Sequence, residues 1–75
     1  MYAFVLISLD SAREQDILQE LANMKEIKEA HILFGEWDML AKVELESPEA
    51  LGTFVMNEIR NVPGVKLTST LIVAR

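Results

Sequence analysis

The residues best able to do chemistry in this chain of 75 residues gather in one short stretch, FGEWDML, from Phe34 to Leu40. It holds a glycine, the carboxylates of Glu36 and Asp38, and Trp37, the only tryptophan in the chain. Two carboxylates this close can act as a paired acid and base. The same residues are also typical of the polar rim of a hairpin turn. The residue types alone leave both interpretations open.

Other residues that could carry a reaction lack partners. The single histidine, His31, has no cysteine or second histidine with which to bind a metal. The serines lack the neighbours that would activate one of them as a nucleophile, and Ser11 and Ser47 precede helix-like stretches as candidate N-caps. The three glycines are scattered, so no glycine-rich phosphate loop is present. We therefore expect no enzymatic activity, no metal site and no cofactor.

Composition narrows the class of protein further. Twelve acidic and seven basic residues give a net charge of −5, which repels a phosphate backbone, so direct nucleic-acid binding is not expected. No apolar run is long enough to span a membrane. The absence of cysteine fits a reducing compartment, and we expect a cytoplasmic protein. A chain this short buries only about 60% of its unfolded surface, which favours association with partners.

The pattern of polar and apolar residues predicts a single domain over residues 1–75. Strands are expected at 2–9, 27–34, 37–46 and 65–73. A capping box formed by Ser11 and Glu14 predicts the start of a first helix, and Ser47 followed by proline predicts the start of a second. A glycine at the first position of a two-residue loop suits a type II′ hairpin turn, so residues 35–36 are expected to join the middle strands.

The predicted order, βαββαβ, is typical of an α+β, ferredoxin-like sandwich. Its two halves repeat a similar pattern at an offset of 38 residues, and each forms one βαβ unit. The predicted fold is a four-stranded antiparallel sheet with two helices on one face, which would leave the second face uncovered. Because the first strand is apolar toward both faces, we expect the chain to associate with itself through its sheets, as a homodimer at least.

Two motifs together resemble a known family. The hairpin GEWDML and the segment VPGVKLTST, from Val62 to Thr70, are similar to the C-terminal effector-binding domain, or RAM domain, of the Lrp/AsnC family of feast/famine regulators. The resemblance covers essentially the whole chain. No helix-turn-helix precedes the first strand, so the chain is expected to be a stand-alone RAM domain.

The resemblance implies a function and partners. Members of the family bind small effectors, typically amino acids, between dimers, and the dimers often associate into octameric or other closed rings. The chain is thus expected to be an amino-acid-binding and oligomerisation module in transcriptional or metabolic regulation. Co-assembly with a DNA-binding Lrp/AsnC relative is a further expectation.

The resemblance also implies where the effector binds. Backbone N–H groups freed at the Gly35 turn can receive an α-carboxylate, and Asp38 can pair with an α-ammonium. The last strand would supply hydroxyl groups and apolar contacts, although strand alternation prevents all its residues from facing one site. The implied effector-binding residues are Gly35, Glu36, Trp37, Asp38, Met39, Thr68, Ser69, Thr70, Leu71 and Ile72.

Three other interpretations remain open. The chain could be a structural oligomerisation adaptor that binds no ligand. It could be a small dimeric α+β barrel enzyme in which a pocket between the sheets presents His31 or Trp37 to a substrate. It could also be an ACT-like amino-acid sensor, although such domains usually carry a glycine in the loop after the first strand, and residues 8–11 contain none.

Overall fold

Strand β1 (Tyr2–Leu9) lies inside the sheet, as expected for a segment that is apolar toward both faces. The computed structural model describes residues 1–75. The elements that follow β1 are α1 (Glu14–Ala22), β2 (Ile27–Ile32), β3 (Met39–Glu44), α2 (Pro48–Phe54), the π-helical turn η1 (Val55–Ile59) and β4 (Val65–Ile72). The strand order is β2-β3-β1-β4, and every neighbouring pair is antiparallel. The predicted α+β, ferredoxin-like fold is therefore confirmed.

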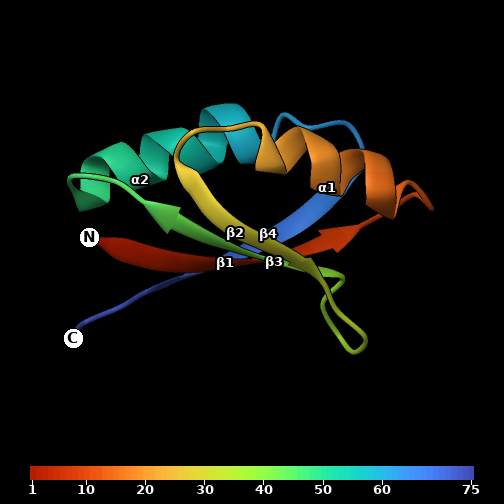
Figure 1. Ribbon diagram of the computed structural model, residues 1–75, viewed down its shortest axis with the longest axis horizontal. Coiled ribbons are helices and arrows are strands. Elements are labelled where there is room, and N and C mark those ends of the chain that lie inside the picture. The colour runs from red at the N-terminus through yellow and green to blue at the C-terminus, as the bar shows by residue number, and fades with distance from the viewer.

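Both helices cover the same face of the sheet, and no element covers the other face (Figure 1). The core lies between the helices and the sheet, where alternate residues of β1 meet the apolar stripes of the helices. No helix is long and apolar enough to cross a membrane. The core consists of 14 buried residues, all of them apolar: Ala3, Val5, Ile7, Ile17, Leu21, Ile27, Met39, Ala41, Val43, Leu51, Phe54, Val55, Ile59 and Val62.

The predicted two-residue turn between β2 and β3 is wrong. β2 ends at Ile32 and β3 begins at Met39, so residues 33–38 connect the two strands. The N–H of Asp38 donates to the carbonyl of Ile7 in β1 at 2.9 Å, and its carbonyl accepts a hydrogen bond from the N–H of Leu33, so Asp38 is bonded on both sides just before β3 begins. The connection therefore has six residues instead of two.

The predicted capping box at the start of α1 is also wrong. The helix begins at Glu14, and its N-cap residue, Arg13, makes no side-chain capping bond. The hydroxyl of Ser11 is instead buried without a hydrogen-bond partner. It lies 2.8 Å from the position that a Cβ on Gly64 would occupy, since the chain leaving β1 passes closely over the start of β4.

The start of the second helix follows the prediction. Ser47 is the N-cap of α2, its Oγ accepts a hydrogen bond from the N–H of Ala50 at 3.1 Å, and Pro48 occupies the first turn. After Phe54 the helix continues as the π-helical turn η1, in which the N–H of Arg60 donates to the carbonyl of Val55 at 2.9 Å. The apolar stripe expected on this helix is buried along its whole length.

Candidate functional site

The connection between β2 and β3, residues 33–38, is held at one end by Asp38. The N–H of Leu33 donates to the carbonyl of Asp38 at 2.8 Å, which closes the loop. The Oδ2 atom of Asp38 accepts a hydrogen bond from the N–H of Leu9 at 2.7 Å, so the side chain binds the end of β1. Together with the bond from its own N–H to the carbonyl of Ile7, this contact holds Asp38 against the end of β1.

The rest of the loop is open. Gly35 has a φ of +149°, and a Cβ built on it would meet no atom within 4 Å. Phe34 is fully exposed, whereas Trp37 is half-buried. The backbone N–H groups of Gly35, Glu36 and Trp37 make no hydrogen bond within the chain. The loop projects from the sheet on the side away from the helices (Figure 1), so these donors are free to bind another molecule.

A surface hollow of about 360 Å³ adjoins the loop. Asp38 lines it together with Leu33 and Phe34 from the loop, and Glu14 and the neighbouring glutamine from the start of α1. The Oδ1 atom of Asp38 accepts no hydrogen bond from the protein, in contrast to Oδ2. The carboxylate is therefore held in one orientation with one oxygen unused.

The predicted site residues of β4 divide between the two faces of the sheet. Thr68, Thr70 and Ile72 pair with buried residues of β1 and lie on the helix side, where they line a groove beside α2. Ser69 and Leu71 lie on the open face. The five residues therefore do not face one site, as strand alternation requires.

The predicted hairpin and β4 residues are separated within one chain by β1. Ile7 pairs with Met39 on one side and with Thr68 on the other, so the two groups flank the end of this strand. Met39 has an exposed fraction of 0% and belongs to the core, where its side chain does not reach the surface. A single subunit thus presents the hairpin and β4 as two separate surfaces.

His31 lies in a polar network on the open face. Its Nε2 lies 3.3 Å from Oε1 of Glu29, and the second oxygen of Glu29 lies 3.6 Å from Nζ of Lys42. Lys42 in turn lies 4.5 Å above the centre of the Tyr2 ring. The hydrogen bond with His31, and then the positive charge of Lys42, hold the pKa of the Glu29 carboxyl below its ordinary value.

Neither His31 nor Trp37 lines any hollow of this chain. No group of three or more histidine, aspartate or glutamate side chains is placed to hold a metal ion.

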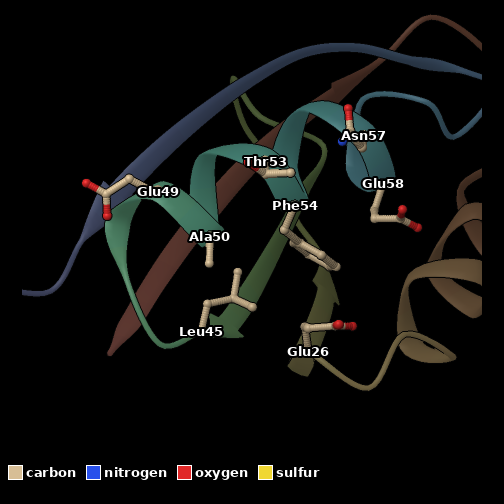
Figure 2. A pocket seen from close by; sticks show the side chains of 8 residues that line it. All are labelled: Glu26, Leu45, Glu49, Ala50, Thr53, Phe54, Asn57 and Glu58. Atoms are coloured by element: carbon tan, nitrogen blue, oxygen red, sulfur yellow. The ribbon is translucent and has the colours of Figure 1, made fainter.

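The largest hollow, about 600 Å³, lies beside the second helix (Figure 2). Leu45, Ala50 and Phe54 form its apolar part, and Glu26 and Glu58, which Figure 2 labels, line it as well. No basic side chain lines it. None of the residues predicted for effector binding reaches this hollow.

The groove between α2 and β4 contains a positively charged side chain that was not among the site residues predicted from the sequence. Arg60, which follows η1, lines this groove of about 300 Å³ with Val55 and Met56. The only indication of this residue in the sequence is that it is a basic residue at the end of an otherwise acidic helical segment. Without the fold, nothing connects it to the threonines of β4.

The structure is a ferredoxin-like sandwich with one uncovered sheet face. Its hairpin loop is held in place by hydrogen bonds and lies beside a surface hollow. The model of the Lrp/AsnC ligand binding domain matches residues 2–75. The chain therefore belongs to the Lrp/AsnC family, which confirms the resemblance seen in its two motifs.

Relatives with the same domain include regulators of transcription. The chain is 34% identical over 73 residues to an uncharacterised helix-turn-helix transcriptional regulator of Pyrococcus furiosus, a match that covers 93% of this chain and 49% of the relative. The chain thus spans about half the length of that relative.

Solved structures are similar along the whole chain. The crystal structure of FFRP-DM1 is 35% identical, with a TM-score of 0.90 and 96% of each chain covered. A transcriptional regulator of Neisseria meningitidis, solved as a complex with L-methionine, shares the fold at 22% identity and a TM-score of 0.89, with 99% of this chain and 49% of that chain covered.

Proposed function

We propose that this chain is a non-catalytic module that binds an amino-acid effector and associates with further copies of itself in the regulation of transcription. Membership of the Lrp/AsnC ligand-binding family supports the class of function. The regulator of Neisseria meningitidis, which shares the fold, is described as a complex with L-methionine, and this supports a free amino acid as the ligand class.

The proposed binding site depends on the carboxylate of Asp38, of which only one oxygen accepts a hydrogen bond within the chain. Oδ2 accepts a hydrogen bond from the N–H of Leu9, so the side chain is already oriented before a ligand binds. Oδ1 accepts nothing from the protein and belongs to a residue that lines the adjoining hollow. An α-ammonium bound to Oδ1 would make a charge-assisted hydrogen bond without any cost of reorienting the aspartate.

The free N–H groups of the loop supply the second half of the recognition. Gly35, Glu36 and Trp37 offer backbone donors that no group of the chain uses. Successive N–H groups at a glycine turn form a concave site for an anion, which suits an α-carboxylate. Recognition of both ends of a zwitterion by one loop distinguishes an amino acid from a simple amine or a simple acid.

Further copies of the chain complete the site in this proposal. The hollow at the loop is open to solvent, and the residues of β4 lie across β1 from it. A second subunit placed over the loop would exclude water and strengthen the ionic contacts to Asp38. We assign DNA contact to a longer, DNA-binding Lrp/AsnC relative that co-assembles with this acidic chain in the cytoplasm.

The test is a titration of free amino acids against the wild type and two variants of Asp38, monitored by Trp37 fluorescence. Asp38→Asn keeps an oxygen that can accept from Leu9 but removes the charge, so it should fold normally and bind about tenfold to a hundredfold more weakly. Asp38→Ala loses both contacts. It should therefore bind as weakly and also lose about 1 kcal/mol of stability, because the N–H of Leu9 loses its partner.

Glu36→Gln is the matched control, since it removes an exposed carboxylate of the same loop that makes no ion pair and no hydrogen bond within the chain, and it keeps the backbone N–H of this residue. It should bind the effector about as well as the wild type. Equal affinity of the wild type and Asp38→Asn for an amino acid would disprove the role of Asp38. Failure of the wild type to bind any amino acid would favour an adaptor that has no ligand.

A further inference from the structure

The groove between α2 and β4 has the composition of a ligand site. Its volume is about 300 Å³, and its walls are apolar along α2 and η1, where Leu51, Val55 and Met56 contribute. Ile72 closes it on the side of β4. Small-molecule sites are typically apolar clefts of this size or larger with a few convergent polar groups.

The polar groups of the groove have no partners within the chain. The side chain of Arg60 makes no ion pair and no hydrogen bond, and neither do the hydroxyls of Thr68 and Thr70. Twelve acidic residues outnumber seven basic ones in the chain, yet none of the residues that line this groove is acidic. Arg60 thus presents an uncompensated positive charge next to an apolar wall and two hydroxyls.

The backbone of the second helix is unusual at this position. The N–H of Arg60 bonds to the carbonyl of Val55, five residues earlier, instead of to that of Met56. Such π-helical turns are rare and occur frequently at functional sites. Here the turn lies within the segment from Val55 to Arg60, and three residues of that segment line the groove.

We infer that the groove between α2 and β4 binds a small aliphatic monocarboxylate, whose carboxylate pairs with Arg60 and the threonine hydroxyls and whose hydrocarbon part lies on Leu51, Val55 and Met56. The guanidinium group matches a carboxylate with two parallel hydrogen bonds. The site is separate from the hairpin and goes beyond the proposed function, since it contains neither Gly35 nor Asp38. It selects for an acid, whereas the hairpin selects for a zwitterion.

Two probes with the same hydrocarbon part test the charge. Sodium hexanoate and hexylamine are titrated separately into the ¹⁵N-labelled protein, and the backbone amide shifts are followed. Hexanoate should shift amides of α2, η1 and β4, while hexylamine should not. Shifts by hexanoate confined to residues 33–38, equal shifts by both probes, or no shift in α2 or β4 at any soluble hexanoate concentration would each overturn the inference.

Variants separate the charge from the shape of the groove. Arg60→Gln should weaken hexanoate binding about tenfold to a hundredfold, the range of one charged hydrogen bond, and Arg60→Lys should restore part of that loss. Gly52→Leu should abolish binding by filling the groove, because a Cβ at Gly52 meets no atom within 4 Å and Gly52 lines the site.

Lys25→Gln, which removes an exposed positive charge away from the groove, is the control for Arg60→Gln, and Asp38→Asn is the control for the hairpin. Both should bind hexanoate as the wild type does. If Lys25→Gln loses as much affinity for hexanoate as Arg60→Gln does, the loss comes from the net charge and not from the groove. Unchanged binding of hexanoate by Arg60→Gln would refute the site. Because Asp38→Asn changes only amino-acid affinity in the proposed function, failure of one site is distinguishable from failure of the other.

Discussion

Glu29 lies in a polar network that changes the pKa of its carboxyl. Its carboxylate has His31 on one oxygen and Lys42 on the other, at 3.3 Å and 3.6 Å. An ionised carboxylate only accepts hydrogen bonds, so Nε2 of His31 is the donor. Both neighbours stabilise the charged form of Glu29 and lower its pKa.

Removal of His31 should therefore raise the pKa of Glu29. In the folded wild type this pKa lies below that of the unfolded chain, so the contribution of Glu29 to stability is present above the ordinary carboxyl range and is lost as the pH falls through the lowered pKa. In His31→Ala the pKa should move back toward the ordinary range of a glutamate carboxyl. A ¹³C NMR titration of the Glu29 carboxyl measures this pKa in the wild type and in His31→Ala. Identical titration curves would contradict the role of His31 in lowering the pKa.

Single residues show what a sequence can and cannot reveal about the site. The residue types of Gly35 and Asp38 left a turn and a binding loop open, and only the family resemblance favoured the hairpin as the site, which stays a prediction. The bond between Asp38 and the N–H of Leu9 was not predictable, because it joins residues 29 positions apart and depends on how the loop meets β1. The partition of Thr68 and Ser69 onto opposite faces follows from alternation, but which face each one takes depends on the sheet register.

At the scale of elements, the chain packs closely against Gly64 where it leaves β1 and enters α1. The N–H of Asp10 donates to the carbonyl of Gly64 at 2.9 Å, which draws the loop onto the start of β4. Gly64 has a φ of +98°, and a Cβ there would lie 2.8 Å from Oγ of Ser11 and 2.9 Å from Cδ1 of Ile17. The junction therefore needs glycine for its backbone conformation and for its lack of a side chain.

Gly64→Ala should lower the free energy of unfolding by about 1–3 kcal/mol, the usual cost of a residue held in a sparsely populated backbone region. Urea unfolding followed by circular dichroism measures the change. Gly52→Ala is the control, because that glycine lies in α2 with open space around its Cβ position. It should leave the stability unchanged or raise it by up to about 1 kcal/mol. Equal effects of the two substitutions would argue against the steric account.

The elements themselves were predictable to different degrees. β1 matches its expected range because a run that is apolar on both faces has few alternatives. α2 begins where Ser47 and proline indicate, since capping is a local interaction. The start of α1 was mispredicted: the chain before it is bonded to the carbonyl of Gly64 through the N–H of Asp10, and the hydroxyl of Ser11 caps nothing. The β2–β3 connection is longer than predicted because the apolar runs extend beyond the strands, of which β2 ends at Ile32 and β3 begins at Met39. The π-helical turn has no recognised pattern in the residue types and appears only in the backbone hydrogen bonds.

At the scale of the whole molecule, one face of the sheet is covered by the helices and the other is uncovered. One face supplies the core, and the other carries apolar side chains with no layer above them, including Leu67 and Leu71, which are 58% and 53% exposed. Phe4 and Leu6 are half-buried on the same face. A surface of this kind on a chain of 75 residues is typical of a protein interface.

Self-association through the open face gives the last prediction. If two sheets pack against each other, each large apolar side chain removed from water contributes about 1.5–3 kcal/mol, and a charge placed among them opposes association. Light scattering at micromolar concentration should find the wild type as a dimer or a larger even-numbered assembly. Leu71→Lys should shift it toward the monomer without unfolding it, because this side chain is already exposed in the single chain. Gln19→Lys, which adds the same charge to the exposed side of α1, should leave the assembly intact. A folded wild-type monomer would contradict self-association, and an assembly that Leu71→Lys leaves unchanged would place the contact elsewhere than on the open face.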